Sequence, residues 1–158
     1  MVAQAYVSAK GDPAALIDPL ERIHTLLHVH ATERGGALVP SGIDVAIATL
    51  PTIEAAIDLA FAMRGEIEAT REPSAHRHGT LTAYAISHGS LVERPDGRVL
   101  GVPIARALRL ATVAGPLSDV LLDERAVVDL PPGLGRYEGK RSVRDLLGFG
   151  FQHLVDYR

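Results

Sequence analysis

The sequence contains no cysteine and no tryptophan, and aromatic residues make up only 4% of its 158 positions. Without cysteine, disulfide bonds, thiolate nucleophiles and cysteine-based metal sites are all excluded. With so few large rings, the core has to be filled by Ala, Val, Leu and Ile, which belong to the 47% of residues that are hydrophobic. This composition favours an aliphatic core of helices and strands in a single domain over residues 1–158.

A dominant charge and long hydrophobic runs are also missing. The formal net charge is −3, and Lys and Arg are interspersed with Asp and Glu, so we expect no nucleic-acid partner. The longest apolar runs, such as residues 45–50, are too short to cross a bilayer, and the N-terminus lacks the pattern of a secretion signal. We therefore expect no membrane partner and a cytoplasmic location.

The pattern of apolar residues and turn residues predicts an α+β fold in the order β-α-β-β-α-β, followed by an extra helix and strands. This is the ferredoxin-like arrangement with additions. We expect a mostly antiparallel sheet, with all three helices packed on one of its faces and the other face left for a twofold partner. The predicted strands span 2–9, 37–39, 45–50, 80–88, 142–147 and 149–157, the helices begin near Pro13, Pro51 and Pro103, and residues 131–139 are predicted to form a loop.

Three segments resemble the catalytic domain of class III adenylate/guanylate cyclases. Residues 96–110, Asp-Gly-Arg-Val-Leu-Gly-Val-Pro-Ile-Ala-Arg-Ala-Leu-Arg-Leu, are similar to the family stretch Phe-Gly-x-x-Val-Asn-x-Ala-x-Arg-Leu. Residues 83–89 are similar to the family strand that ends Gly-Ile-His-x-Gly. Residues 33–36, Glu-Arg-Gly-Gly, lead into the predicted hairpin as in the family. The resemblance covers nearly the whole chain and implies the cyclase fold.

In that family two aspartates bind two Mg²⁺ ions, which help to activate the ribose 3′-hydroxyl for attack on the α-phosphorus. The resemblance places Asp44 at the hairpin aspartate and Ser8 at the first-strand aspartate. A neutral hydroxyl does not replace a bridging carboxylate. Asp12 takes this role if the alignment shifts, although a helix cap explains it better.

The other family positions are mostly altered. The residues that read the purine base fall on Pro40, which has no side-chain donor, and on Arg98, which cannot accept a hydrogen bond. The asparagine that orients the ribose falls on Ala105, and the lysine that holds the triphosphate falls on Leu147. The arginine that stabilises the transition state is retained as Arg109.

Two further patterns have simpler explanations. The histidines at positions 24, 28, 30, 76 and 78 have spacings that could hold Zn²⁺, but they lack a carboxylate at a diagnostic place, and surface or interface histidines explain them better. Residues 133–140 resemble a phosphate-binding loop, but Leu134 stands where its first glycine belongs and Arg141 where it requires Ser or Thr.

We therefore interpret the chain as a catalytically degenerate cyclase homology domain that acts as a dimerisation or regulatory module in signal transduction. It is not expected to be an enzyme. We expect no resident cofactor, with Mg²⁺ or Mn²⁺ present only if a nucleotide binds, and a homodimer as the assembly. The alternative is a divergent purine nucleotide cyclase, active as a homodimer or completed by an intact partner in a heterodimer.

Overall fold

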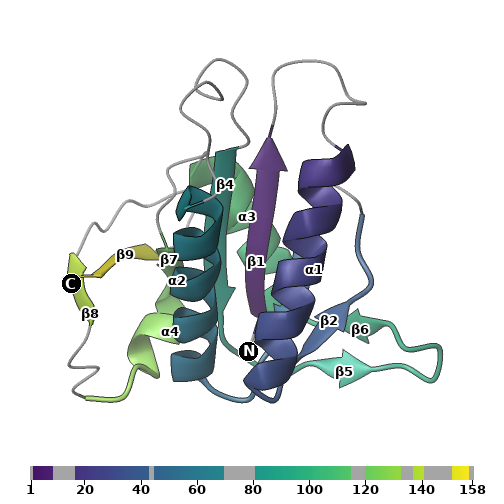
Figure 1. Ribbon diagram of the computed structural model, residues 1–158. Coiled ribbons are helices and arrows are strands. Elements are labelled where there is room, and N and C mark those ends of the chain that lie inside the picture. The colour runs from purple at the N-terminus through teal and green to yellow at the C-terminus, as the bar shows by residue number, and fades with distance from the viewer. Residues whose placement is uncertain are drawn as a thin grey trace.

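The computed structural model describes residues 2–8, 17–42, 45–69, 81–114, 120–132, 137–140 and 151–156. They form strands and helices in the order shown in Figure 1. The elements are β1 (Val2–Ser8), α1 (Ile17–Glu33), β2 (Ala37–Val39), β3 (Val45–Thr49), α2 (Ile53–Ala69), β4 (Leu81–Ser87), β5 (Val92–Glu93), β6 (Val99–Leu100), α3 (Val102–Ala114), β7 (Val120–Asp123), α4 (Glu124–Val128), β8 (Tyr137–Lys140) and β9 (Phe151–Asp156).

The described strands form one large sheet in the order β2-β3-β1-β4-β7-β9-β8, and β5 and β6 form a separate hairpin. The first four strands of this order, with α1 and α2 as their connections, make up the β-α-β-β-α-β unit. Strand β1 is central and antiparallel to both β3 and β4. Only β4 and β7 pair in parallel among the described strands. The predicted α+β fold and mostly antiparallel sheet are confirmed.

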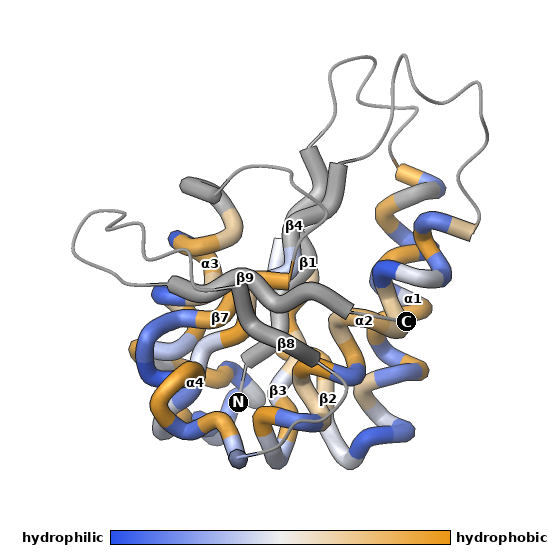
Figure 2. The backbone as a smooth tube through the Cα atoms, turned by 90° about the vertical axis from the view of Figure 1, so that its left-hand side faces the viewer, coloured by the Kyte–Doolittle hydropathy of each residue, from blue (hydrophilic) through white to orange (hydrophobic). Residues whose placement is uncertain are grey.

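The helices cover both faces of the sheet, so the prediction that all three lie on one face was wrong. Ala46 and Ala48 of β3 point into the core cluster under α1 and α2, whereas Ile47 points into a second cluster with Ala107 and Leu110 of α3. Figure 2 views the sheet from its β8 side, with α3 on one side and α1 and α2 on the other. Consequently, α3 covers part of the sheet face that was expected to await a partner.

The boundaries of α1 and α2 follow from local chemistry. After α1, the Gly36 amide donates to the Ala31 carbonyl at 2.8 Å and Gly35 adopts a φ of 70°, which is the Schellman ending that glycine favours. A Cβ on Gly36 would lie 2.3 Å from the Thr49 carbonyl oxygen. Only glycine at position 36 therefore allows the chain after α1 to lie this close to the end of β3. Helix α2 begins after Thr52, whose hydroxyl accepts a hydrogen bond from the Ala55 amide.

Two C-terminal predictions need correction. Residues 137–139 were assigned to a loop, but β8 begins at Tyr137 and pairs with β9. The strand predicted over 142–147 lies outside the described residues. No helix in the described part of the chain is long and apolar enough to cross a membrane.

Candidate functional site

The end of β1 is the place where the family resemblance locates the metal-binding carboxylates. Ser8 is the last residue of β1, and two residues earlier Tyr6 pairs with Val45, the first residue of β3. Because β1 and β3 are antiparallel, the carboxyl end of β1 lies beside the amino end of β3. Asp44 immediately precedes Val45 in the sequence but lies outside the described residues. Leu147, at the position of the triphosphate-binding lysine, also lies outside them.

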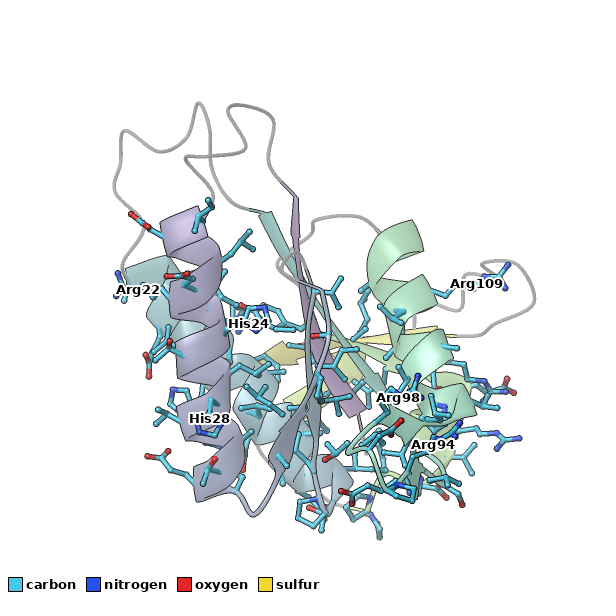
Figure 3. The ribbon with its side chains drawn as sticks, turned by 90° about the vertical axis from the view of Figure 1, so that its right-hand side faces the viewer. Arg22, His24, His28, Arg94, Arg98 and Arg109 are labelled. Carbon is cyan, nitrogen blue, oxygen red and sulfur yellow. The ribbon has the colours of Figure 1, made fainter. Side chains whose placement is uncertain are left out.

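The outer face of α3 carries the two positions that the resemblance assigns to the ribose and the transition state. Ala105 and Arg109 are one helical turn apart and both are exposed, whereas Ala107 and Leu110 are buried against the sheet. Figure 3 shows the Arg109 side chain directed away from the sheet, apart from Arg98. The helix therefore displays Arg109 at the surface. One turn earlier, Ala105 has a methyl group where the family has the amide that orients the ribose.

The turn between β5 and β6 fixes Arg98 against its own hairpin. The Arg98 Nε donates to Asp96 Oδ2 at 2.7 Å, and its Nη2 lies 2.6 Å from the same oxygen. The Arg98 amide donates to Asp96 Oδ1, and Gly97, at a φ of 76°, donates its amide to the Arg94 carbonyl. The side chain at the base-reading position is thus engaged by a carboxylate two residues away.

The other base-reading position, Pro40, is exposed and directly follows β2. The next residue, Ser41, donates its hydroxyl to the Val45 carbonyl at 2.6 Å and so links the two arms of the β2–β3 connection. A proline ring offers neither a donor nor an acceptor to a base.

Arg98 lowers the pKa of Asp96 below its ordinary value of 3.8, first through the side-chain hydrogen bond and then through the backbone one. We expect Arg98→Ala to raise the Asp96 pKa toward the ordinary value, because the charged donor is lost while the backbone donor remains. An NMR titration of the Asp96 carboxyl carbon measures this shift. Arg94→Ala, on the same hairpin, is the control and should leave the Asp96 pKa unchanged. Equal titration curves for Arg98→Ala and the unmodified protein would contradict the assignment.

A buried polar network, which the sequence analysis did not find, lies between α3 and the sheet. The Ser87 hydroxyl at the end of β4 donates to Asp123 Oδ2 at the end of β7, and Arg106 of α3 places Nη1 3.9 Å from the same oxygen. Asp123 Oδ1 accepts the Ala126 amide at 2.8 Å and thereby caps α4. Ser87 and Asp123 are only 0% and 3% exposed, so this network ties β4, β7, α3 and α4 together.

The histidines do not assemble into a metal site within the described ranges. His30 Nε2 lies 2.6 Å from Glu66 Oε1 and bridges α1 to α2. His24 is half-buried and His28 is exposed on α1. The contact between the two helices accounts for His30, which favours an interface histidine over a metal ligand. Residues 76–78 lie outside the described part of the chain.

Neither a protein-family model nor a curated protein sequence matches the chain. Solved structures do match. The adenylyl cyclase CyaB from P. aeruginosa is similar with a TM-score of 0.75 at 15% identity, over 99% of this chain and 93% of that one. A dimeric guanylyl cyclase domain of the RhoGC fusion protein from Blastocladiella emersonii gives 0.69 at 10% identity, over 99% and 94%. An adenylate cyclase from Trypanosoma brucei in its monomeric state gives 0.69 at 13% identity, over 97% and 86%. The chain has the fold of the class III nucleotidyl cyclase domain.

Proposed function

We propose that this chain is a catalytically incompetent cyclase-fold module, which acts in signalling by associating with a second copy of itself or with another protein. The observation that carries the proposal is the engagement of Arg98 by Asp96. At the position that reads the purine base in the family, the chain has a donor that is already bound to a carboxylate. A guanidinium held in this way offers no acceptor to a base amino group.

The residues at the metal-binding positions do not fit a pair of divalent ions. Mg²⁺ and Mn²⁺ in nucleotide sites are held by carboxylate oxygens, and β1 ends in Ser8, a neutral hydroxyl. Asp44, at the other metal-binding position, is a carboxylate, so the chain has one carboxylate where the family has two. Mg²⁺ or Mn²⁺ belongs to this proposal only as the companion of a bound nucleotide.

The exposure of Arg109 favours a second candidate, a divergent cyclase completed by an intact partner. Arg109 lies on the outer face of α3 and points away from the sheet (Figure 3), where a partner subunit can approach it. In such a heterodimer this chain would contribute the transition-state arginine, and the partner would contribute the metal-binding carboxylates. Mixing this chain with an intact cyclase domain separates the two candidates, because only the second predicts a gain in the partner's turnover that Arg109→Ala abolishes.

A double variant, Ser8→Asp with Leu147→Lys, tests the proposed loss of the nucleotide site. We expect it to bind a fluorescent ATP or GTP analogue with Mn²⁺ about tenfold more tightly than the unmodified chain, since a carboxylate and a triphosphate cation are restored. Turnover should stay at background, because Ala105 still leaves the ribose unoriented.

The matched control for this experiment is Ser8→Asn with Leu147→Met, which changes the same positions without adding charge. It should bind no better than the unmodified chain. If the unmodified chain already bound the analogue as tightly as the double variant, positions 8 and 147 would not be the cause of any loss and the proposal would have to be abandoned.

A further inference from the structure

The chain contains no asparagine, and Asp96-Gly97 is the only place where glycine follows aspartate. Both features concern one reaction, in which the amide nitrogen of the following residue attacks the side-chain carbonyl carbon of Asn or Asp. Glycine allows this attack most readily because it has no Cβ to hinder the approach. The sequence therefore concentrates this chemistry at a single step. Figure 1 shows that the β5–β6 hairpin, which carries the step, projects from the body, and both residues are exposed.

The hairpin requires glycine at position 97. The Gly97 amide donates to the Arg94 carbonyl at 2.9 Å, and the Arg94 amide donates to the Arg98 carbonyl at 2.8 Å. Gly97 has a φ of 76°, in the left-handed region that ends a three-residue hairpin loop and that strains a residue with a side chain. The geometry of the turn thus places beside Asp96 the neighbour that hinders the rearrangement least.

The Asp96 carboxylate is engaged at both oxygens by Arg98. The Arg98 amide donates to Oδ1 at 3.1 Å, and its Nε donates to Oδ2 at 2.7 Å. The side-chain hydrogen bond is the main reason why the pKa of Asp96 lies below 3.8, so the carboxyl is held in its charged form. A charged carboxylate resists attack by the amide nitrogen, because the attack would add negative charge to it. The Gly97 amide is engaged as well, by Arg94, so the folded turn restrains both reacting groups.

We infer that Asp96-Gly97 is a site of isoaspartate formation and that Arg98 slows this modification. In the first step, the Gly97 nitrogen forms a bond to Cγ of the protonated Asp96 carboxyl, and the nitrogen proton and the carboxyl hydroxyl leave together as water. The product is a five-membered succinimide ring. In the second step, one water molecule opens the ring at either carbonyl, which yields aspartate again or isoaspartate. The water that was released is regained, so no oxidant, reductant or cofactor is needed.

Isoaspartate carries the main chain through the side-chain carbon, which adds one atom to the backbone of the turn. The three-residue loop between Arg94 and Arg98 is closed by a backbone hydrogen bond, and an added atom does not fit this geometry. The modification would therefore release the β5–β6 pairing, in which Val92 is opposite Leu100. Arg98 thus has a role in the chemical lifetime of the hairpin, and this role is independent of the proposed function.

Isoaspartate at position 96 is quantified after incubation of the folded chain at about pH 5, where aspartate is mostly charged. Liquid chromatography separates the aspartate and isoaspartate forms of the peptide that spans the turn, and electron-transfer fragmentation identifies them. We expect Arg98→Ala to accumulate isoaspartate at least about threefold faster than the unmodified chain, because a higher pKa leaves more of the carboxyl protonated at any pH above it. The ratio of the two rates should narrow as the pH falls below the Asp96 pKa, since the carboxyl is then protonated in both proteins.

Three further samples serve as controls. Arg94→Ala, on the same hairpin, keeps the contact of Asp96 with Arg98 and should react at the rate of the unmodified chain. Arg98→Lys keeps the charge but loses the planar contact, so it should react at an intermediate rate. The unmodified chain unfolded in urea has neither restraint and should react fastest. Circular dichroism verifies that the variants are folded, which is expected because Arg98 is 64% exposed.

Two results would overturn the inference. Equal rates for folded Arg98→Ala and the folded unmodified chain would show that Arg98 does not restrain the modification. Isoaspartate in the unfolded chain but in none of the folded proteins would show that the turn is not a site of this reaction.

Discussion

Replacing Asp123 by alanine is expected to lower the free energy of unfolding by about 3 kcal/mol or more. The change removes the N-cap of α4, which is typically worth ~1 kcal/mol. It also leaves the fully buried Ser87 hydroxyl without the acceptor that it has in the native protein, at a cost of about 1–3 kcal/mol. In addition, Arg106 loses its buried carboxylate neighbour, and breaking such a charge contact inside a protein is destabilising.

Asp129→Ala is the matched control for this prediction. Asp129 lies at the other end of α4 and contacts His88, but the two side chains are 49% and 39% exposed. Exposed pairs of this kind contribute roughly 0–1 kcal/mol. Urea unfolding followed by circular dichroism, at one fixed protein concentration, measures both variants. If Asp123→Ala and Asp129→Ala unfolded at the same urea concentration, the network would not hold α3 and α4 to the sheet.

Asp123→Asn separates the contributions within the network. Asparagine retains an oxygen that can cap α4, but it removes the negative charge next to Arg106. We expect Asp123→Asn to lose less stability than Asp123→Ala and more than Asp129→Ala. A double-mutant cycle with Ser87→Ala isolates the Ser87 contribution, because residues in contact are not additive.

Local sequence patterns were sufficient to predict most of the fold. The second helix was predicted to begin near Pro51, and α2 begins after Thr52. Residues 33–36 were predicted to lead into the hairpin, and their two glycines end α1. Both signals could be used because capping residues act on their own neighbours in the chain. The β5 and β6 strands were not predicted, since two residues each are too few to show a period.

The choice of sheet face for α3 could not be predicted in the same way. The periodicity of Ala107, Leu110 and Ala111 shows which side of α3 is buried, but it does not show which face of the sheet covers that side. The strand at Tyr137 was missed because the glycines at 133, 135 and 139 favoured a loop.

The candidate site was predictable only in part. Ala105 and Arg109 are four positions apart, so the sequence alone places them on the same face of α3. The structure shows that this face is exposed. The contact of Arg98 with Asp96 depends on how the turn closes. The link between Ser87 and Asp123 joins residues 36 positions apart, and only the parallel pairing of β4 with β7 brings them together. A local signal did exist, because Asp123 precedes Glu124 as a typical N-cap residue would. The sequence does not show that the Asp123 side chain is buried.

The purified chain is expected to show no cyclase turnover. In the family, the catalytic groups act together on a single transition state, and removing one electrostatic donor typically costs about 10²–10³-fold in rate. By the resemblance, this chain lacks a metal-binding carboxylate at Ser8, the ribose-orienting amide at Ala105 and the triphosphate cation at Leu147. Losses at several such positions should bring the rate to background, even though Arg109 is retained.

The most direct test is to incubate the purified chain with ATP or GTP and Mn²⁺ and to quantify the 3′,5′-cyclic nucleotide by mass spectrometry. Mn²⁺ is the stringent choice because it tolerates poorer ligand geometry than Mg²⁺ but does not supply a missing carboxylate. An intact cyclase domain under the same conditions provides the positive control, and Arg109→Ala reveals any contaminating host enzyme. We predict no product above the protein-free blank. Product that increases with protein concentration and disappears in Arg109→Ala would contradict the proposed loss of catalysis.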